Sequence, residues 1–307
     1  MDRAGALFKG VNVSRKSVSS LCRTSLAALG VVTLAACVDS ATQYRDYAEQ
    51  VARQGGLRTV TSAPDAAYTD ADLARNFERI AFFTEYTHAD GALVQEETPS
   101  TLSRWNDEMR VSLLGAGVRS EDWRNLRKLS RRLSNLSGLQ MRVGRHADPD
   151  ISIYIMTEEE RTEFGREIED DERRDDFQIL SDWSTQFRYP CVALVGYESE
   201  GQGVIDAAII VIKAELEGVM RQSCIHEELT QAMGLMNDHP DVRPSIFNDD
   251  EEFALLTEHD EALLRILYDK RLRPAMTLEE AKPIIPLVVK DAQKAKEQNV
   301  ELLQANY

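Results

Sequence analysis

The sequence contains no apolar run of the roughly 18 to 20 residues that a membrane-spanning helix requires, which excludes a polytopic membrane protein. Basic residues are outnumbered, 36 against 52 acidic ones, so the net charge is −16. Because binding to a polyanion normally needs a basic face, we expect no nucleic-acid partner. Signals for a phosphate cradle, a dinucleotide or a haem are missing too. The hydrophobic content of 43% is nevertheless enough to bury a core.

The first 36 residues differ from the rest of the chain in charge and hydropathy. Five basic residues and one acidic residue precede an uncharged stretch from Thr24 to Ala36. This order is typical of a secretory signal peptide, whose apolar segment is too short to remain as a membrane span. We therefore expect residues 1–36 to be a signal peptide.

The uncharged stretch ends in Leu34-Ala35-Ala36-Cys37, which resembles a bacterial lipobox. The resemblance implies that Cys37 becomes the lipidated first residue of the mature chain and anchors it in the bilayer of the cell envelope. Val38 rather than Asp follows the cysteine, which by the same resemblance implies the outer membrane, facing the periplasm. An ordinary signal peptide with an incidental cysteine is the alternative.

The chain after this segment is strongly acidic. Residues 1–36 carry a net charge of +4, so the remainder carries −20. Repulsion from anionic lipid then leaves the acyl group on Cys37 as the membrane contact. Residues 37–68 have no sustained apolar period, and we expect them to form a flexible tether. An envelope protein or a peptide is the further partner we expect.

Two of the four cysteines remain for the folded part of the chain. Cys22 leaves with the signal peptide, and Cys37 is used by lipid. In an exported, oxidising compartment, Cys191 and Cys224 most simply form one disulfide. A pair of buried thiols is the alternative.

Apolar spacing after the tether predicts a single α+β domain over residues 69–276 and a helical C-terminal tail over 277–307. Helices are predicted where apolar residues recur every three or four positions: from Thr69, over 120–136 and over 215–236. Strands are predicted where apolar residues alternate or run continuously: 109–113, 139–143, 151–155, 191–195 and 204–212. The almost wholly charged segment 158–176 is interpreted as an exposed helix or ordered insertion. This order favours one mixed sheet with packed helices.

The helix predicted over 215–236 carries a cluster of polar residues beside its apolar stripe. At about 100° per residue, Glu227, Glu228 and Gln231 share one arc, and the apolar residues share another. A solvated helix face is the simplest interpretation of such a pattern. A structural role is also open, in which these side chains cap backbone groups or hold the loop 237–250 by hydrogen bonds.

A resemblance to metallopeptidases gives the same cluster another meaning. From His226 the string begins like the zincin motif H-E-x-x-H, but Thr230 stands at the second histidine and cannot replace it. One residue later the chain resembles the metzincin motif H-E-x-x-H-x-x-G-x-x-H. The residues in its conserved positions are Glu227, Glu228, Gln231, Gly234 and Asn237. The glutamate and the glycine match, whereas all three histidines are replaced.

The sequence further downstream extends this resemblance. Phe247 stands where metzincins carry the methionine of a turn, and residues 256–268 look like their closing helix. More closely, the strings CIHEELTQAMGLMND and SIFNDD are similar to an uncharacterised proteobacterial family of lipoproteins, domain-of-unknown-function family 2927. That similarity runs from about Asp70 to Met276. The combined resemblance implies a zincin-like mixed sheet with packed helices.

Two functions follow from the resemblance. Because imidazole and thiolate give zinc sites their affinity, the loss of the histidines implies a non-catalytic binding or envelope-organising module. The alternative is a metal-dependent peptidase in which Glu228 is the general base. Its metal, Zn²⁺ or the oxygen-preferring Ca²⁺, would be held by the following residues: Glu227, Gln231, Asn237 and Asp238, with His226 and His239 as further candidates.

Overall fold

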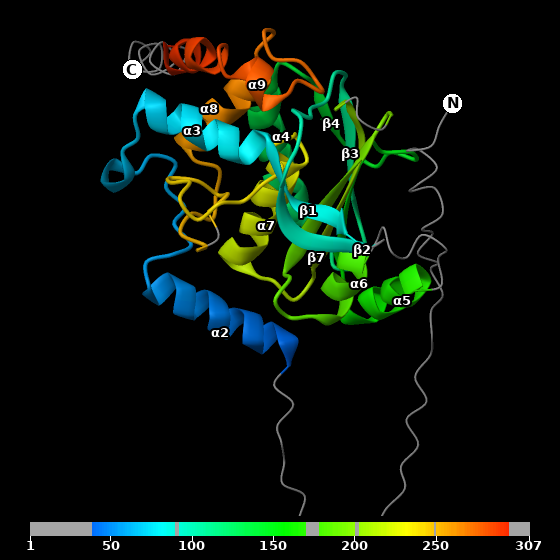
Figure 1. The fold of residues 1–307 in the computed structure, drawn as a ribbon. Helices are drawn as coiled ribbons and strands as arrows, with labels where there is room; N and C mark the ends of the chain where they lie inside the picture. Colours follow the sequence, from blue (N-terminus) through cyan, green and yellow to red (C-terminus); the bar gives the residue numbers. More distant parts are fainter. Residues whose placement is uncertain (1–38, 90–91, 170–177, 200–202, 249, 295–307) are drawn as a thin grey trace, which may run out of the picture.

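The computed structural model describes residues 39–89, 92–169, 178–199, 203–248 and 250–294 (Figure 1). The predicted signal peptide and Cys37 lie outside these residues. Within them, every helix is too short or too polar to cross a bilayer.

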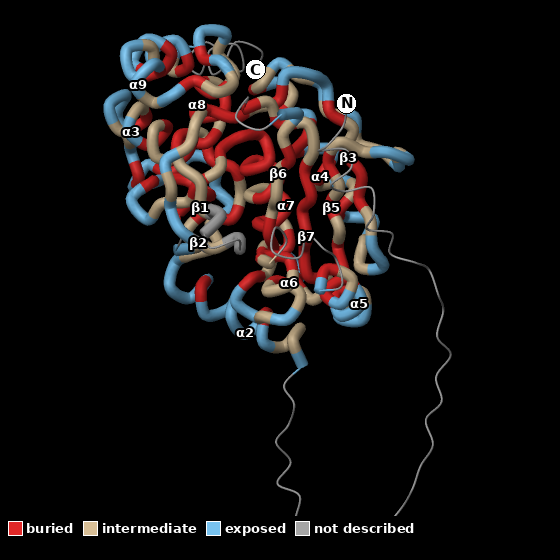
Figure 2. The backbone as a smooth tube through the Cα atoms, turned by 45° about the vertical axis from the view of Figure 1, so that its right-hand side comes forward, coloured by how far each residue is buried: buried red, intermediate tan, exposed pale blue. Residues whose placement is uncertain are grey.

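A five-stranded mixed sheet forms the centre of the molecule. Its strands are β3 (Met109–Leu114), β4 (Met141–Val143), β5 (Ile151–Met156), β6 (Cys191–Tyr197) and β7 (Ile205–Lys213). They lie in the order β4-β3-β5-β7-β6, with β6 the only antiparallel member among the described residues. Strand β7, which is apolar from Ala207 to Ile212, is hydrogen-bonded on both sides, and buried residues run through it and β5 (Figure 2). The predicted α+β class with a mixed sheet is confirmed.

Alternating residues of the strands face two separate cores. On one face, Ile153 and Ile210 pack in the larger core with α3 (Asp70–Ala81), α4 (Ser120–Ser137), α7 (Gly218–Gln231) and α8 (Glu258–Leu267). On the other face, Ile209 and Val211 pack against α5 (Glu158–Glu169) and α6 (Gln178–Thr185). The highly charged segment thus forms an amphipathic helix, α5, as far as residue 169, and residues 170–177 lie outside the described part.

A hairpin of β1 (Phe83–Ala89) and β2 (Ala92–Pro99) forms a separate two-stranded sheet. The sequence predicts no strand here, because the segment is polar and lacks the alternation of a half-buried strand. The hairpin brings Glu85 to the candidate site.

The expectation of a flexible tether over 37–68 is wrong for its described part. Residues 40–53 form the helix α2 (Ser40–Arg53), and a 3-10 turn follows at Pro64–Ala66. Tyr44 and Val51 are buried, and with Ala48 they make a short stripe at helical spacing that fixes α2 on the domain. The Tyr44 hydroxyl donates to the Phe187 carbonyl at 2.7 Å and accepts from Lys213 Nζ at 3.2 Å.

Replacing Tyr44 by Phe should therefore lower the free energy of unfolding by about 1 kcal/mol, because Lys213 Nζ and the Phe187 carbonyl each lose a partner. Chemical denaturation of both proteins measures the difference. The exposed Gln50, replaced by Ala, is the control on the same helix. Equal stability of Tyr44→Phe and the wild type would show that α2 does not dock in this way.

The predicted C-terminal tail is helical as far as the structure describes it. It contains α9 (Leu278–Ala281), which begins with a capping box between Thr277 and Glu280, and a helical stretch over 285–294. Ile285, Val288 and Val289 are buried in the larger core. The tail therefore packs on the domain up to residue 294.

Candidate functional site

Helix α7 follows β7 directly and packs against both β6 and β7. Cys224, on the side of α7 that faces β6, forms the predicted disulfide with Cys191, with 5.8 Å between the Cα atoms. The bridge ties the edge strand to the helix one turn before Glu227 and Glu228. The disulfide prediction is thus confirmed, and the positions of both elements around the site are fixed covalently.

Helix α7 ends earlier than the sequence predicts, at Gln231 rather than near Met236. Gly234 adopts a φ of +113°, and a Cβ at this position would lie 2.0 Å from the carbonyl oxygen of Ser103. Only glycine fits this backbone conformation and this close approach. The chain therefore reverses after the helix, and residues 237 and 238 reach the site from a loop.

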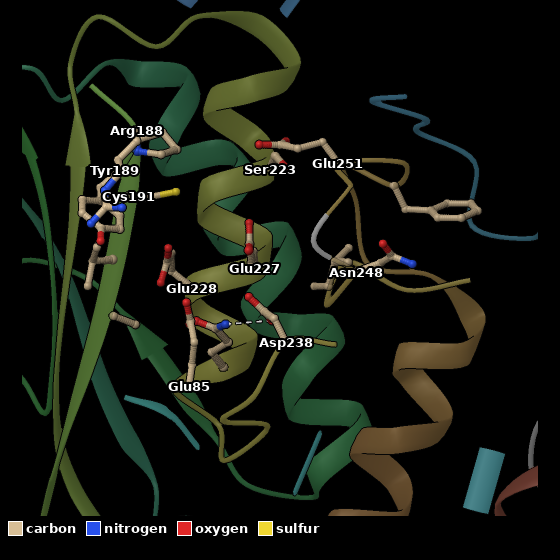
Figure 3. Close-up of a pocket in the computed structure, with 16 residues that line it drawn as sticks. Glu85, Arg188, Tyr189, Cys191, Ser223, Glu227, Glu228, Asp238, Asn248 and Glu251 are labelled. Carbon is tan, nitrogen blue, oxygen red and sulfur yellow. Dashed lines mark hydrogen bonds between the residues drawn. The ribbon is translucent and has the colours of Figure 1, made fainter. Parts of the chain in front are cut away.

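A cavity of about 220 Å³ lies between α7, β6, the hairpin residue Glu85 and the loop after α7 (Figure 3). We call it the acidic pocket, because five carboxylates line it: Glu85, Glu227, Glu228, Asp238 and Glu251. Apolar side chains, including Val192, Ile246 and Phe253, form other parts of its wall. The pocket joins residues that are more than 160 positions apart in the chain.

Glu228 is the most buried of these carboxylates, with 5% of its surface exposed. The backbone N–H of Ala193 on β6 stabilises its charged form, whereas Oε2 has no hydrogen-bond partner. Burial and then the charges of Glu85 and Asp238 raise the pKa of Glu228 well above 4.5. For Glu227 the pKa is also raised, first by burial and then by Asp238 and Glu228. Both carboxyls hold protons more readily than they would in water.

Four of the predicted site residues come together here. Glu227, Glu228, Gln231 and Asp238 all line the acidic pocket, and the Gln231 side-chain amide donates to Asp238 Oδ1 at 3.1 Å (Figure 3). The shared arc of α7 supplies the first three. Asp238 joins them because the turn at Gly234 folds the chain back.

Asn237, predicted as a metal ligand, does not line the pocket. It is fully buried on the other side of the loop, where Nδ2 donates to the Arg79 carbonyl and to Glu97 Oε2, both at 3.0 Å. In a non-helical segment, neighbouring side chains such as those of residues 237 and 238 point to different sides. The metzincin spacing, read as one continuous site, therefore fails at its last position.

The two histidine candidates also lie outside the lining of the pocket. His226 Nδ1 accepts from the backbone N–H of Leu256 at 3.1 Å, and burial followed by the charges of Arg132 and Lys128 lowers its pKa to about 4. His239 Nδ1 accepts from the Asp241 backbone N–H at 3.1 Å within a tight turn.

The donor set does not fit a zinc centre. Within the described residues, no three His, Cys, Asp or Glu side chains gather closely enough to hold one metal ion. The described lining of the pocket offers carboxylates and the amides of Gln231 and Asn248 without imidazole, whereas zinc affinity in proteins comes mainly from imidazole and thiolate.

Sequence reasoning missed Glu85 and Glu251 as members of the site. Glu85 belongs to the unpredicted hairpin, and Glu251 lies in an acidic run outside the predicted helices and strands. Instead, Glu251 adopts a φ of +58° and bonds to Tyr47 of α2, and burial raises its pKa. Its positive φ and burial have no signal in the sequence.

The loop after α7 is held by a network around Asp260. This residue accepts from Ser245 Oγ at 2.5 Å, from the Ile246 N–H at 3.2 Å and from Thr257 Oγ1 at 2.8 Å. Phe247, which stands in the place of the metzincin methionine, is fully buried beside this network. The predicted closing helix is α8, whose first turn carries Asp260.

Stability should fall as pH rises above about 4.5, because folding raises the pKa values of Glu227 and Glu228. Well below pH 4.5 these groups are protonated in both states and contribute no penalty. Above their folded pKa values the native state must hold unfavourable charges, at about 1.4 kcal/mol for each pKa unit. The double variant Glu227→Gln/Glu228→Gln should be more stable than wild type at pH 8 and equally stable near pH 4. Thermal unfolding across this range measures the difference, and parallel profiles would contradict it.

Comparison with known proteins identifies the family. A family model described as "Protein of unknown function (DUF2927)" matches residues 70–287. The match covers most of the chain, which therefore belongs to this family. No curated protein and no solved structure matches the chain.

Proposed function

We propose that this member of the family is a lipid-anchored envelope protein whose zincin-like domain binds a ligand in the acidic pocket without catalysing a reaction. The observation that carries the proposal is the convergence of Glu227, Glu228 and Asp238 around one cavity whose lining, among the described residues, contains no imidazole. Buried carboxylates of like charge lower stability, and Glu228 Oε2 has no partner. A purely structural role would not need this arrangement, although one contact of Glu228 is with the β6 backbone.

The zincin-like part of the proposal is supported by the order and position of the elements. As in the motif's family, the helix that carries the glutamate follows the sheet, and a glycine turn ends it. Here α7 presents Glu228 to the antiparallel edge strand β6. The three histidine positions of the motif hold Glu227, Gln231 and Asn237, and Asn237 does not line the pocket. This supports a zincin-like domain without the standard zinc site.

The experiment that tests this function combines three measurements on one preparation of the purified protein. We expect zinc and calcium below stoichiometric amounts in elemental analysis, and no cleavage of a panel of peptides. In a thermal-shift screen of peptides, amines, sugars and metals, at least one ligand should stabilise the wild type and leave Glu228→Gln unchanged. Stoichiometric metal together with peptide cleavage lost in Glu228→Gln would instead establish the metallopeptidase, with Glu228 as general base.

The anchor is tested separately. In bacteria fed radiolabelled palmitate, the protein should be labelled and should fractionate with the outer membrane. Replacement of Cys37 by Ser should abolish the label and release the protein. Label retained in Cys37→Ser, or an unlabelled wild type, would contradict the lipid anchor and the envelope location that depends on it.

A further inference from the structure

We propose that the acidic pocket takes an organic monocation of side-chain size: a guanidinium or ammonium group on an apolar stem, as at the end of an arginine or lysine side chain of a peptide. This rests on the proposed binding role and adds the chemical class of the ligand.

The charge of the pocket is the first reason. Five carboxylates line it, and among the described lining residues Arg188 is the only cation. Its guanidinium donates to Gln186 Oε1 at 3.0 Å and stacks 4.4 Å from the centre of the Tyr189 ring, at the edge of the group in Figure 3. The acidic cluster around Glu227 and Glu228 thus favours a positively charged ligand.

The second reason is an unsatisfied acceptor. The Glu228 side chain is more than nine-tenths buried and is directed into the pocket, and Oε2 has no hydrogen-bond partner. Native proteins pair the great majority of buried polar atoms, so an orphan acceptor inside a cavity points to a missing donor. An N–H of a cation supplies both the hydrogen bond and the opposite charge.

Size and shape separate an organic cation from a metal ion. The cavity measures about 220 Å³, which is below the roughly 300–1,000 Å³ of pockets for drug-sized ligands. A calcium ion needs several oxygen ligands, each about 2.3–2.6 Å from the metal. Within the described residues, no three His, Cys, Asp or Glu side chains lie close enough together to hold a metal ion. A guanidinium carries five N–H donors and an ammonium three, so either can serve carboxylates that lie further apart.

The apolar part of the wall fits the stem of the same ligand. Val192, Ile246 and Phe253 line the pocket together with the carboxylates. Long cationic side chains bury their methylene groups against such surfaces while the charged end keeps polar partners. A small inorganic cation would leave these walls without a contact.

Isothermal titration calorimetry at pH 7.5 tests the proposal with four probes: butylguanidinium, butylammonium, the neutral butylurea and CaCl₂. We expect at least one of the two organic cations to bind with a stoichiometry of one. Butylurea should bind roughly tenfold or more weakly, because it lacks the charge. Glu228→Gln should weaken the binding of the cation by a similar factor. Glu159→Gln, which removes an exposed charge on α5, should leave the affinity unchanged.

The thermal melting temperature shows whether each variant is folded, and Asp238→Asn replaces Glu228→Gln if the latter is not. Equal binding of butylurea and the cations, or cation binding unaffected by both variants, would overturn the proposal. So would calcium binding that excludes both cations. If the cations fail while another ligand binds in a Glu228-dependent manner, the ligand class is wrong and the binding function stands. Cation binding accompanied by Glu228-dependent peptide cleavage would support the ligand class and contradict the proposal that the domain is non-catalytic.

Discussion

Loss of the Cys191–Cys224 disulfide should lower the free energy of unfolding by about 3 to 4 kcal/mol, the value expected from chain entropy for a 33-residue separation. The bridge joins the edge strand β6 to α7, so without it the unfolded chain gains freedom and the two walls of the acidic pocket lose their covalent link. Denaturant unfolding of the oxidised protein and of Cys191→Ala/Cys224→Ala measures the effect.

Reduction of the wild type with a thiol reagent should reproduce the loss, and the same reagent should leave the double variant unchanged. A thiol count on the purified protein without reductant must show Cys191 and Cys224 blocked. Two free thiols, or a double variant as stable as the wild type, would contradict the account of how β6 and α7 are held together.

Replacement of Arg221 by Leu should cost about 3 to 5 kcal/mol, because it removes one member of a buried ion pair. Arg221 and Asp122 are 2% and 1% exposed, and the guanidinium donates to both carboxylate oxygens at 2.8 and 2.7 Å. It also donates to the backbone carbonyl of Gly117. The change leaves the Asp122 charge buried without its partner, where α7 packs on α4.

The double variant Arg221→Leu/Asp122→Leu should recover much of the lost stability, since no uncompensated charge remains. The control is Arg124→Leu, at an exposed position of α4, which should change stability by less than about 0.5 kcal/mol. Chemical denaturation of all four proteins gives the comparison. A single variant Arg221→Leu with wild-type stability would show that this pair does not anchor α7.

The fold was predictable wherever one short segment carries its own signal. The stripe of leucines in α4 and the apolar run Ala207–Ile212 in β7 are such segments, and the Thr69 and Thr277 capping boxes mark the starts of helices. The hairpin β1–β2 and the helix α2 were not predicted, because their few apolar residues form too weak a local pattern. Both elements are stabilised by contacts with distant parts of the chain. For α2 these contacts include Phe187 and Lys213, over 140 residues away.

The same limit applies to the candidate site. Glu227, Glu228 and Gln231 share an arc of one helix, so their proximity could be predicted from the helical period. The positions of Asp238 and Asn237 depend on the turn at Gly234. After this turn Asp238 lines the pocket, whereas Asn237 donates to the Arg79 carbonyl. Glu85 and Glu251 arrive through tertiary packing, and no local pattern marks them. The spacing of the motif therefore predicted Glu227, Glu228 and Gln231 in the pocket lining and misplaced Asn237.

The most direct test of the account is an NMR titration of the carboxyl carbons of Glu227 and Glu228, recorded with and without a chelator. We predict that both groups titrate well above pH 4.5, that each midpoint moves when the other residue is replaced by Gln, and that the chelator changes neither. Ordinary midpoints near 4.5 would mean that the side chains extend into water rather than converge on a pocket, and a chelator-dependent titration would reveal a metal centre.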